Sequence, residues 1–229
     1  MIHRFHNHHG FGDCFWHMNW LDRAKIPSIL YCKEEHHADL KDLFPNAPVK
    51  LRPIQEHPND SFNCWIGASL PFSWHASLCP RNLILFLCET WFEQLSRMAG
   101  VENPFKFVED FLYQGYCKEP SNKTTLLIDC EPRSGQWSQM DMEGLKNLNA
   151  PRLHRIRHGE YSLRHIGLIS THSDIIAGVA TGPLWPCLNT SNKGKKFVIL
   201  LDQVELNYGP SLEIIHCKTV KELEAHLDL

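Results

Sequence analysis

The chain has 229 residues, of which 43% are hydrophobic and 21% charged, a composition that can bury a core and excludes wholesale disorder. The formal net charge of -3 excludes a uniformly basic nucleic-acid coat but allows local basic patches. Apolar runs are too short for a transmembrane helix, and residues 1–6 lack the apolar core of a secretory signal. We expect a cytoplasmic protein of one large domain or two small ones.

The first 120 residues alternate predicted strands with predicted helices, which is typical of parallel strands joined by crossover helices. The longest periodic stretch is the helix predicted before Gly100, whose apolar residues fall on one helical face. The predicted strands in this half are 1–5, 27–32, 49–52 and 64–68. The predicted helices are 14–24, 33–44 and 82–99.

The polar stretch 118–123 predicts a linker, after which the pattern restarts. The predicted strands of the second half are 124–130, 153–157, 174–178, 197–202 and 212–217. The predicted helices are 141–148, 162–171, 183–188 and 220–227. The sequence therefore indicates an α/β fold with two lobes, residues 1–120 and 121–229.

Nine cysteines are scattered singly, and none forms a Cys-x-x-Cys pair. This spacing argues against a zinc knuckle or a thioredoxin-like motif. Several cysteines follow apolar runs, as Cys32 and Cys130 do. We expect free, buried thiols in a reducing cytosol.

The segment Gly10-Phe11-Gly12-Asp13 connects the first predicted strand with the first predicted helix. A glycine such as Gly12 in this turn allows the backbone to approach a ligand, and the helix amides favour anions. Asp13 is a favoured N-cap residue. It would instead be a general base if it faced a cleft at the carboxyl ends of the strands.

Two turns in the second half are candidates for binding phosphate. Thr181, Gly182 and Pro183 follow a predicted strand, and proline at the first helical position marks a helix start whose amides would suit a diphosphate. A plain strand-to-helix connection explains the same residues. Arg133 and Ser134 could contact phosphate oxygens, or they belong to an ordinary surface loop.

The chain has 15 histidines and 7 tryptophans, which is unusual. Imidazoles so close together on a loop do not define a coordination geometry, so we expect structural or substrate-contacting histidines and no metal site. Aromatic side chains suit sugar rings and unstacked bases, although Trp16 and Trp20 also have the spacing of a helix core. The candidate acceptor contacts are His8, His9, Trp16, His17, Trp65 and Trp74.

Three segments together resemble the heptosyltransferase-like glycosyltransferases of GT-B fold. They are the run from Gly12 to His17, the run from Leu126 to Trp137, and the run from Ile166 to Pro183. The resemblance implies two Rossmann-like lobes whose parallel sheets face a cleft. It also implies that Asp13 is the catalytic base and that the turn at Thr181 holds the donor diphosphate.

The function that this resemblance implies is transfer of a sugar from a nucleoside-diphosphate sugar to an acceptor hydroxyl, with inversion and without a metal or other cofactor. The acceptor would be a glycan or lipid-linked saccharide, or a hydroxymethylated DNA base. The alternatives are a phage-type DNA-modifying glycosyltransferase and a non-catalytic nucleotide- or sugar-binding module of the same fold. The basic run 152–158 would contact donor phosphates or nucleic acid, or form a solvated strand edge.

Overall fold

The chain folds into two compact α/β units, here called unit 1 (Met1–Phe111) and unit 2 (Leu112–Leu229). The division falls nearer the N-terminus than the expected boundary at residue 120. The computed structural model describes residues 2–8, 10–63, 91–106, 112–116, 124–130, 142–149, 152–200 and 211–227.

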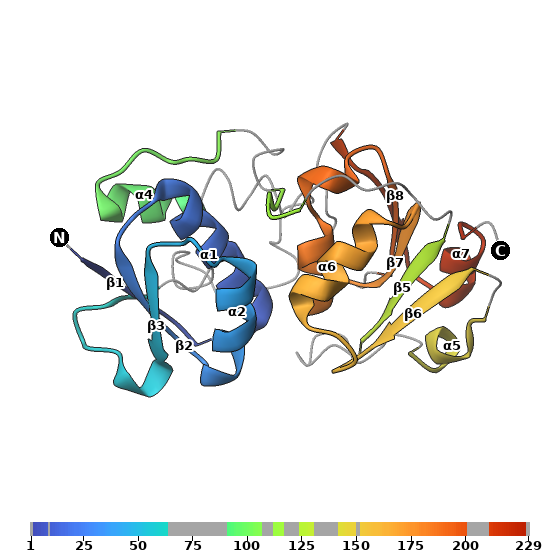
Figure 1. The fold of residues 1–229 in the computed structure, drawn as a ribbon, viewed down its shortest axis with the longest axis horizontal. Helices are drawn as coiled ribbons and strands as arrows, with labels where there is room; N and C mark the ends of the chain where they lie inside the picture. Colours follow the sequence, from blue (N-terminus) through green and yellow to red (C-terminus); the bar gives the residue numbers. More distant parts are fainter. Residues whose placement is uncertain are drawn as a thin grey trace. The chain divides into compact units, whose positions relative to one another are not determined.

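Unit 1 is built on a parallel sheet in the order β3-β2-β1-β4, of which Figure 1 labels β1, β2 and β3. Its strands are β1 (His3–Asn7), β2 (Ser28–Cys32), β3 (Val49–Pro53) and the two-residue β4 (Phe62–Asn63). Its helices are α1 (Phe11–Ala24), α2 (His37–Leu43) and α4 (Glu93–Ala99), with 3-10 turns η1 (Glu34–His36) and η2 (Ile54–Glu56).

Aromatic contacts hold α1 on one face of this sheet. The ring of Phe5 on β1 meets the ring of Trp20 on α1 edge to face, with centroids 5.8 Å apart. The Trp20 indole N–H donates a hydrogen bond of 3.1 Å to Ser96 Oγ on α4, and Phe15 packs on Phe44 after α2. The core of unit 1 therefore lies between α1 and the β1 face that carries Phe5.

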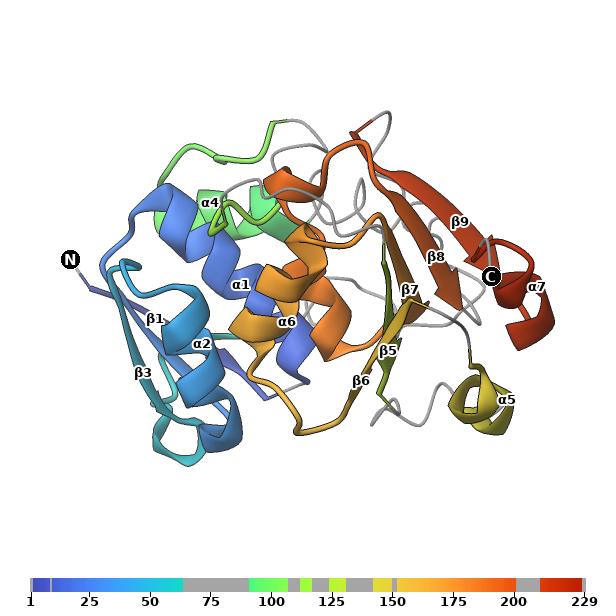
Figure 2. The same cartoon turned by 45° about the vertical axis from the view of Figure 1, so that its right-hand side comes forward.

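Unit 2 is built on a parallel sheet in the order β6-β5-β7-β8-β9. Its strands are β5 (Thr125–Asp129), β6 (Leu153–Arg157), β7 (Ile175–Val179), β8 (Lys196–Leu200) and β9 (Glu213–Cys217). Figure 2 shows α6 (Leu163–Thr171) on one face and α5 (Met142–Asn147) and α7 (Val220–Glu224) on the other. The 3-10 turns η8 (Gly182–Cys187) and η9 (Thr190–Asn192) connect β7 with β8.

Two central strands of unit 2 approach each other closely at Gly178. This residue is paired with Ile128 across β7 and β5 and has φ +140. A Cβ atom at this position would lie 2.4 Å from the Ile128 carbonyl oxygen. Only glycine fits both the conformation and the space.

Most predicted elements of the described residues are present, and β6 has the predicted bounds. Two helix predictions need correction. The predicted helix 33–44 is divided into η1 and α2, and the predicted helix 183–188 is the 3-10 turn η8, because Pro186 inside it lacks an N–H donor. The predicted linker 118–123, the strand 64–68 and the first part of the helix 82–99 lie outside the described residues.

The prediction of free, buried cysteines is confirmed for the described residues. The thiols concerned are those of Cys14, Cys32, Cys130, Cys187 and Cys217. Burial raises the pKa of Cys130 and of Cys187 to about 12. These thiols are therefore protonated at neutral pH and act as small apolar residues of the core.

A buried ion pair joins β5, β6 and α5 in unit 2. Arg155 Nη1 lies 2.6 Å from Asp129 Oδ2, and the two side chains are 16% and 3% exposed. The same guanidinium donates hydrogen bonds to the carbonyl oxygens of Leu145, at 3.0 Å, and of Leu148. Arg155 therefore satisfies one carbonyl of α5 and the carbonyl of the first residue after it, as well as a buried carboxylate.

We expect Arg155→Met to lower the free energy of unfolding by about 3–5 kcal/mol, because it leaves the buried charge of Asp129 unpaired. Urea denaturation followed by circular dichroism measures the change. Arg97→Met, which breaks an exposed pair with Glu93, is the control and should cost at most about 0.5 kcal/mol. The double variant Asp129→Asn/Arg155→Met should recover part of the loss, and an equal loss in both variants would contradict this explanation.

Candidate functional site

The sheet of unit 1 has a topological switch point at the carboxyl end of β1. The chain proceeds from β1 through β2 to β3 on one side, and β4 then pairs with β1 on its other side. In open α/β sheets, ligands bind outside the carboxyl ends of the strands where the strand order reverses. Gly10 leads from this end of β1 into α1, so the first turn of α1 lies at the expected ligand edge.

Asp13 lies in the first turn of α1 and is partly exposed. The N-cap of this helix is Gly10, so the interpretation of Asp13 as the N-cap residue is wrong. Burial raises the pKa of Asp13 to about 6. A hydrogen bond from its own backbone amide lowers the pKa, but by less than burial raises it. A carboxylate with this pKa is mostly ionised at neutral pH yet accepts a proton readily, which suits a general base. Gly12, the other site residue predicted here, immediately precedes it and is partly exposed.

The predicted acceptor-contacting residues of unit 1 differ in their exposure to solvent. His8 directly follows β1 and is exposed. Trp16 and His17 on α1 are 3% and 0% exposed, so in this structure they are core residues and present no surface to an acceptor. His9, Trp65 and Trp74 lie outside the described residues.

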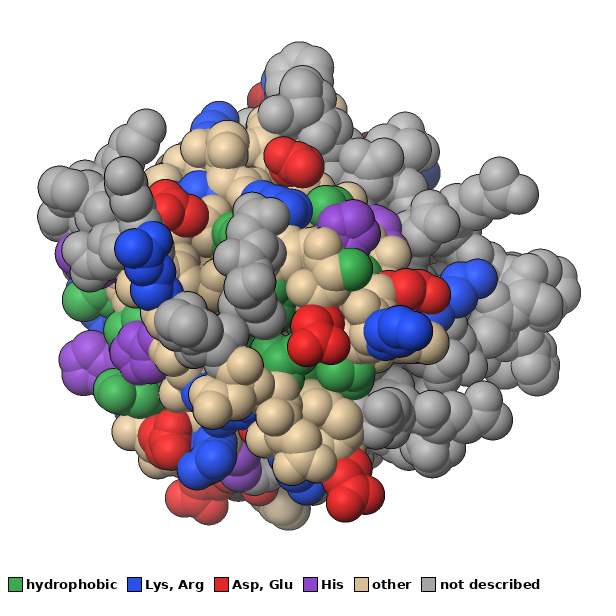
Figure 3. Space-filling view, turned by 90° about the vertical axis from the view of Figure 1, so that its right-hand side faces the viewer, with side chains coloured by type: hydrophobic (Ala, Val, Ile, Leu, Met, Phe, Trp, Pro, Cys, Tyr) green, Lys and Arg blue, Asp and Glu red, His purple; other side chains and the backbone are tan. Residues whose placement is uncertain are grey.

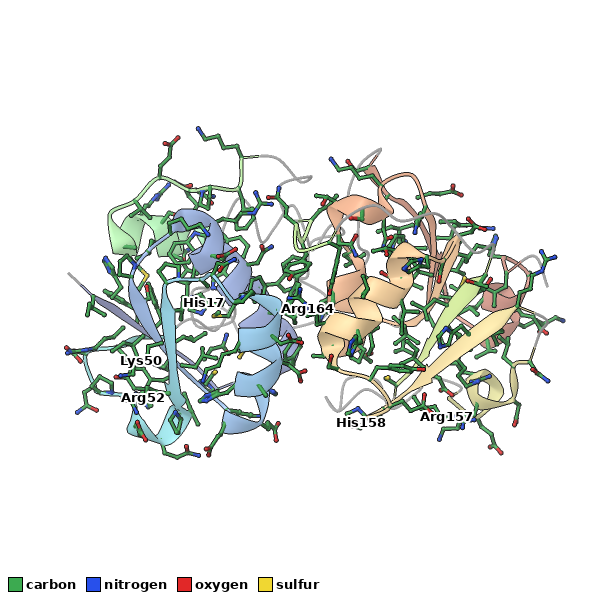
Figure 4. All side chains as sticks on the ribbon, in the orientation of Figure 1. His17, Lys50, Arg52, Arg157, His158 and Arg164 are labelled. Carbon is green, nitrogen blue, oxygen red and sulfur yellow. The ribbon has the colours of Figure 1, made fainter. Side chains whose placement is uncertain are left out.

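His17 is a buried histidine, and neither ring nitrogen has a hydrogen bond to a described residue. Its ring (labelled in Figure 4) packs edge to face on Phe5, with centroids 5.1 Å apart, and its centroid also lies 6.0 Å from that of Trp20 and 6.1 Å from that of Trp91. Burial lowers the pKa of His17 to about 3, so the ring is neutral at physiological pH. The side chain contributes packing to the core, and burying its two polar nitrogens has a cost in free energy that no described residue offsets by a hydrogen bond.

Histidine side chains also gather around Ser61, which lies just before β4. His6 Nδ1 lies 2.7 Å from Ser61 Oγ, and His57 Nδ1 lies 3.3 Å from the same oxygen. The rings of His6 and His57 are stacked with centroids 4.4 Å apart, and His8 lies 6.4 Å from His6. The pKa of His6 is lowered, chiefly because the ring is partly buried and to a smaller extent because the rings of His57 and His8 are close to it. The sequence alone did not associate His57 or Ser61 with the N-terminal histidines.

In unit 2 the strand order reverses between β5 and β7, which places the Thr181 turn at the expected ligand edge. Thr181 is buried, its amide donates to the Val179 carbonyl at 2.7 Å, and its carbonyl accepts from Leu184 at 2.9 Å. Gly182 and Pro183 then begin η8, whose six residues form a 3-10 turn and not the predicted donor helix. Arg133 and Ser134 lie outside the described residues.

Asp129, at the carboxyl end of β5, is a polar residue of this edge that sequence reasoning did not select. One carboxylate oxygen pairs with Arg155, and the other has no hydrogen-bond partner among the residues that the structure describes. The available signal was an aspartate that ends a strand of buried residues, beside a predicted strand rich in arginine.

The described residues contain no group of three or more His, Cys, Asp or Glu side chains arranged to hold a metal ion. Nor, in the described ranges, is any helix long and apolar enough to cross a membrane. Comparison of the chain with protein-family models, with curated proteins and with solved structures gives no match.

We expect His17→Leu to remove a pH dependence from the stability of the protein. Unfolded His17 binds a proton below pH 6.5, its ordinary pKa, whereas the folded residue does so only below about 3. Stability therefore falls as the pH falls through this range, with a contribution of about 1.4 kcal/mol per pH unit from this residue. Urea denaturation of both proteins at several pH values measures the difference.

The pH dependence of the wild type alone does not isolate His17, because Asp13 changes the stability in the opposite direction as the pH falls. Its folded pKa of about 6 exceeds its ordinary value of 3.8, so between these values its contribution to stability falls as the pH rises. This contribution cancels when the wild type and His17→Leu are subtracted. Equal pH slopes for the two proteins would show that His17 is not a buried neutral residue.

Proposed function

We propose that the protein is a glycosyltransferase that moves a sugar from a nucleoside-diphosphate sugar to an acceptor hydroxyl, with Asp13 as the general base. In this proposal the two α/β units are the lobes of a GT-B enzyme, with the acceptor on unit 1 and the donor on unit 2. The observation that carries the proposal is the environment of Asp13. A partly exposed carboxylate lies in the first helical turn, at the switch point of a parallel sheet, with its pKa raised to about 6.

The raised pKa supports a role in proton transfer. A surface aspartate with an ordinary pKa is a weak base, and a group whose pKa is close to the working pH is most effective. Burial, the largest cause of the shift at Asp13, is also the common cause of perturbed carboxyl groups at functional sites. Helix α1 holds the residue in place because its buried stripe, including Phe15 and Trp20, is fixed in the core of unit 1.

The donor side of the proposal rests on the Thr181 turn and the strands that lead to it. Gly178 brings β7 close to β5, and the turn emerges at the switch point of the unit 2 sheet. The first amides of a helical turn have no partner within that turn. The amide at Gly182 could therefore donate to a phosphate oxygen of the donor.

In the proposed reaction these groups have the following roles. Asp13 takes the proton of the acceptor hydroxyl as its oxygen forms a bond to the anomeric carbon. The bond between this carbon and the phosphate oxygen breaks, and the nucleoside diphosphate leaves with the bonding electrons. Attack from the side opposite the leaving group inverts the anomeric configuration, and amide donors stabilise the charge that develops on the diphosphate.

We expect Asp13→Asn to reduce turnover by about 10²–10⁴-fold and to leave donor binding unchanged, because the amide keeps the shape but cannot accept the proton. Donors are first identified by the rise in melting temperature with UDP-glucose, GDP-mannose or ADP-glucose. Release of the diphosphate is then measured with glycan and hydroxymethylated-DNA acceptors. In the wild type, turnover should rise with pH through about 6, as Asp13 ionises.

The matched control is Asp22→Asn, which removes a carboxylate from the same helix where it pairs with Lys25. This variant should keep wild-type turnover. Binding of a nucleotide sugar without any release of diphosphate would favour a non-catalytic module of the same fold. If no nucleotide sugar raises the melting temperature, the transferase proposal is wrong.

A further inference from the structure

The two faces of the unit 1 sheet differ in chemistry. Side chains alternate between faces along a strand, and paired residues of parallel strands share a face. Phe5, Leu30 and Leu51 are paired across β1, β2 and β3 and lie on the face that α1 covers. The residues between them along the strands therefore point to the opposite face.

The opposite face carries two cross-strand rows with cationic or imidazole side chains at their ends. In the first row Arg4 pairs with Ile29, and Ile29 with Lys50. In the second row His6 pairs with Tyr31, and Tyr31 with Arg52. These rows, together with His57, are here called the basic face.

The cations of the basic face are accessible. Lys50 and Arg52 are exposed on β3 (Figure 4), and neither has an ion pair or hydrogen bond with a described residue. Arg4 keeps a side-chain exposure of 49% although it pairs with Asp60. On the face drawn in Figure 3, by contrast, Lys and Arg side chains lie among Asp and Glu side chains.

The spacing of the basic face suits an extended polyanion. Neighbouring strands lie about 4.8 Å apart and alternate residues of a strand about 6.6 Å apart, so the four row ends form a rectangle of about 10 by 6.6 Å. A single exposed phosphate or carboxylate could not reach all of these positions. A chain with repeated negative charges could.

Histidine rings at one side of the basic face indicate which polyanion fits. His57 is exposed, and its ring already stacks on His6. Histidine rings are among the side chains on which unstacked bases lie in single-stranded nucleic acids. In a duplex the bases are stacked on one another, and a broad sheet face does not enter its grooves.

We propose that the basic face binds single-stranded nucleic acid, with Arg4, Lys50 and Arg52 contacting phosphates and His57 stacking on a base. This surface lies on the sheet face opposite α1, so the proposal does not depend on Asp13 or on glycosyl transfer. It also does not distinguish DNA from RNA, because the contacts are to phosphates and base faces.

The test is fluorescence anisotropy with labelled oligothymidylate and oligouridylate of about 20 nucleotides, between about 50 and 200 mM salt. The wild type should bind at least one of them more tightly than a duplex of equal length. Lys50→Gln/Arg52→Gln should weaken binding on the order of tenfold and reduce the slope of log K against log salt by about 1.4, the loss of two phosphate contacts. His57→Ala should weaken binding roughly fivefold with the slope unchanged at neutral pH.

The matched control is Lys218→Gln/Lys221→Gln, which removes two exposed lysines of unit 2 and should bind as the wild type does. Circular dichroism of each variant verifies that it is folded. The proposal is overturned if the wild type binds neither oligonucleotide at the lowest salt, if a duplex binds as tightly, or if the two double variants bind equally. None of these results bears on Asp13→Asn, so the two proposals fail independently.

Discussion

The packing of α1 against β1 is the contact on which the rest of unit 1 depends. Phe5 on the strand and Trp20 on the helix meet in the core, and Trp20 also connects α1 to α4 through Ser96. Because a helix is rigid, fixing its middle also fixes its first turn. Asp13 is thereby held at the sheet edge without a side-chain cap on the helix. The position of the candidate base is a consequence of aromatic packing elsewhere on the same helix.

The buried polar groups of the two units are stabilised to different degrees. The Asp129 carboxylate is buried, and it is tolerated because Arg155 pairs with it and also donates to the carbonyls of Leu145 in α5 and of Leu148 just after it. His17 has no such partner within the described part of the chain, and its lowered pKa keeps it neutral. Asp13 lies between these cases, since partial exposure allows the charged form while burial makes it less favourable. This intermediate environment raises the pKa of Asp13 to about 6, close to neutral pH.

The sequence predicted elements better than it predicted sites. Regular alternation of apolar strands and helices was enough to predict β6 and the parallel α/β pattern of both units. Trp16 and His17 were assigned to an acceptor surface, although their place in a helix beside Trp20 also fitted a core, and packing decided for the core. The contacts of Ser61 with His6 and His57 depend on the strand order β3-β2-β1-β4, in which β4 returns beside β1. No local pattern contains that information.

The two proposals for unit 1 use opposite faces of one strand. Phe5 points to α1 and to the core that supports Asp13, whereas Arg4 and His6 point to the basic face. Doubly wound sheets usually bury both faces, and their strands are then apolar throughout, as β5 and β7 are in unit 2. β1 and β3 instead alternate buried with exposed or half-buried residues. This alternation places Arg4, His6, Lys50 and Arg52 on the face opposite α1, where the proposed polyanion would bind.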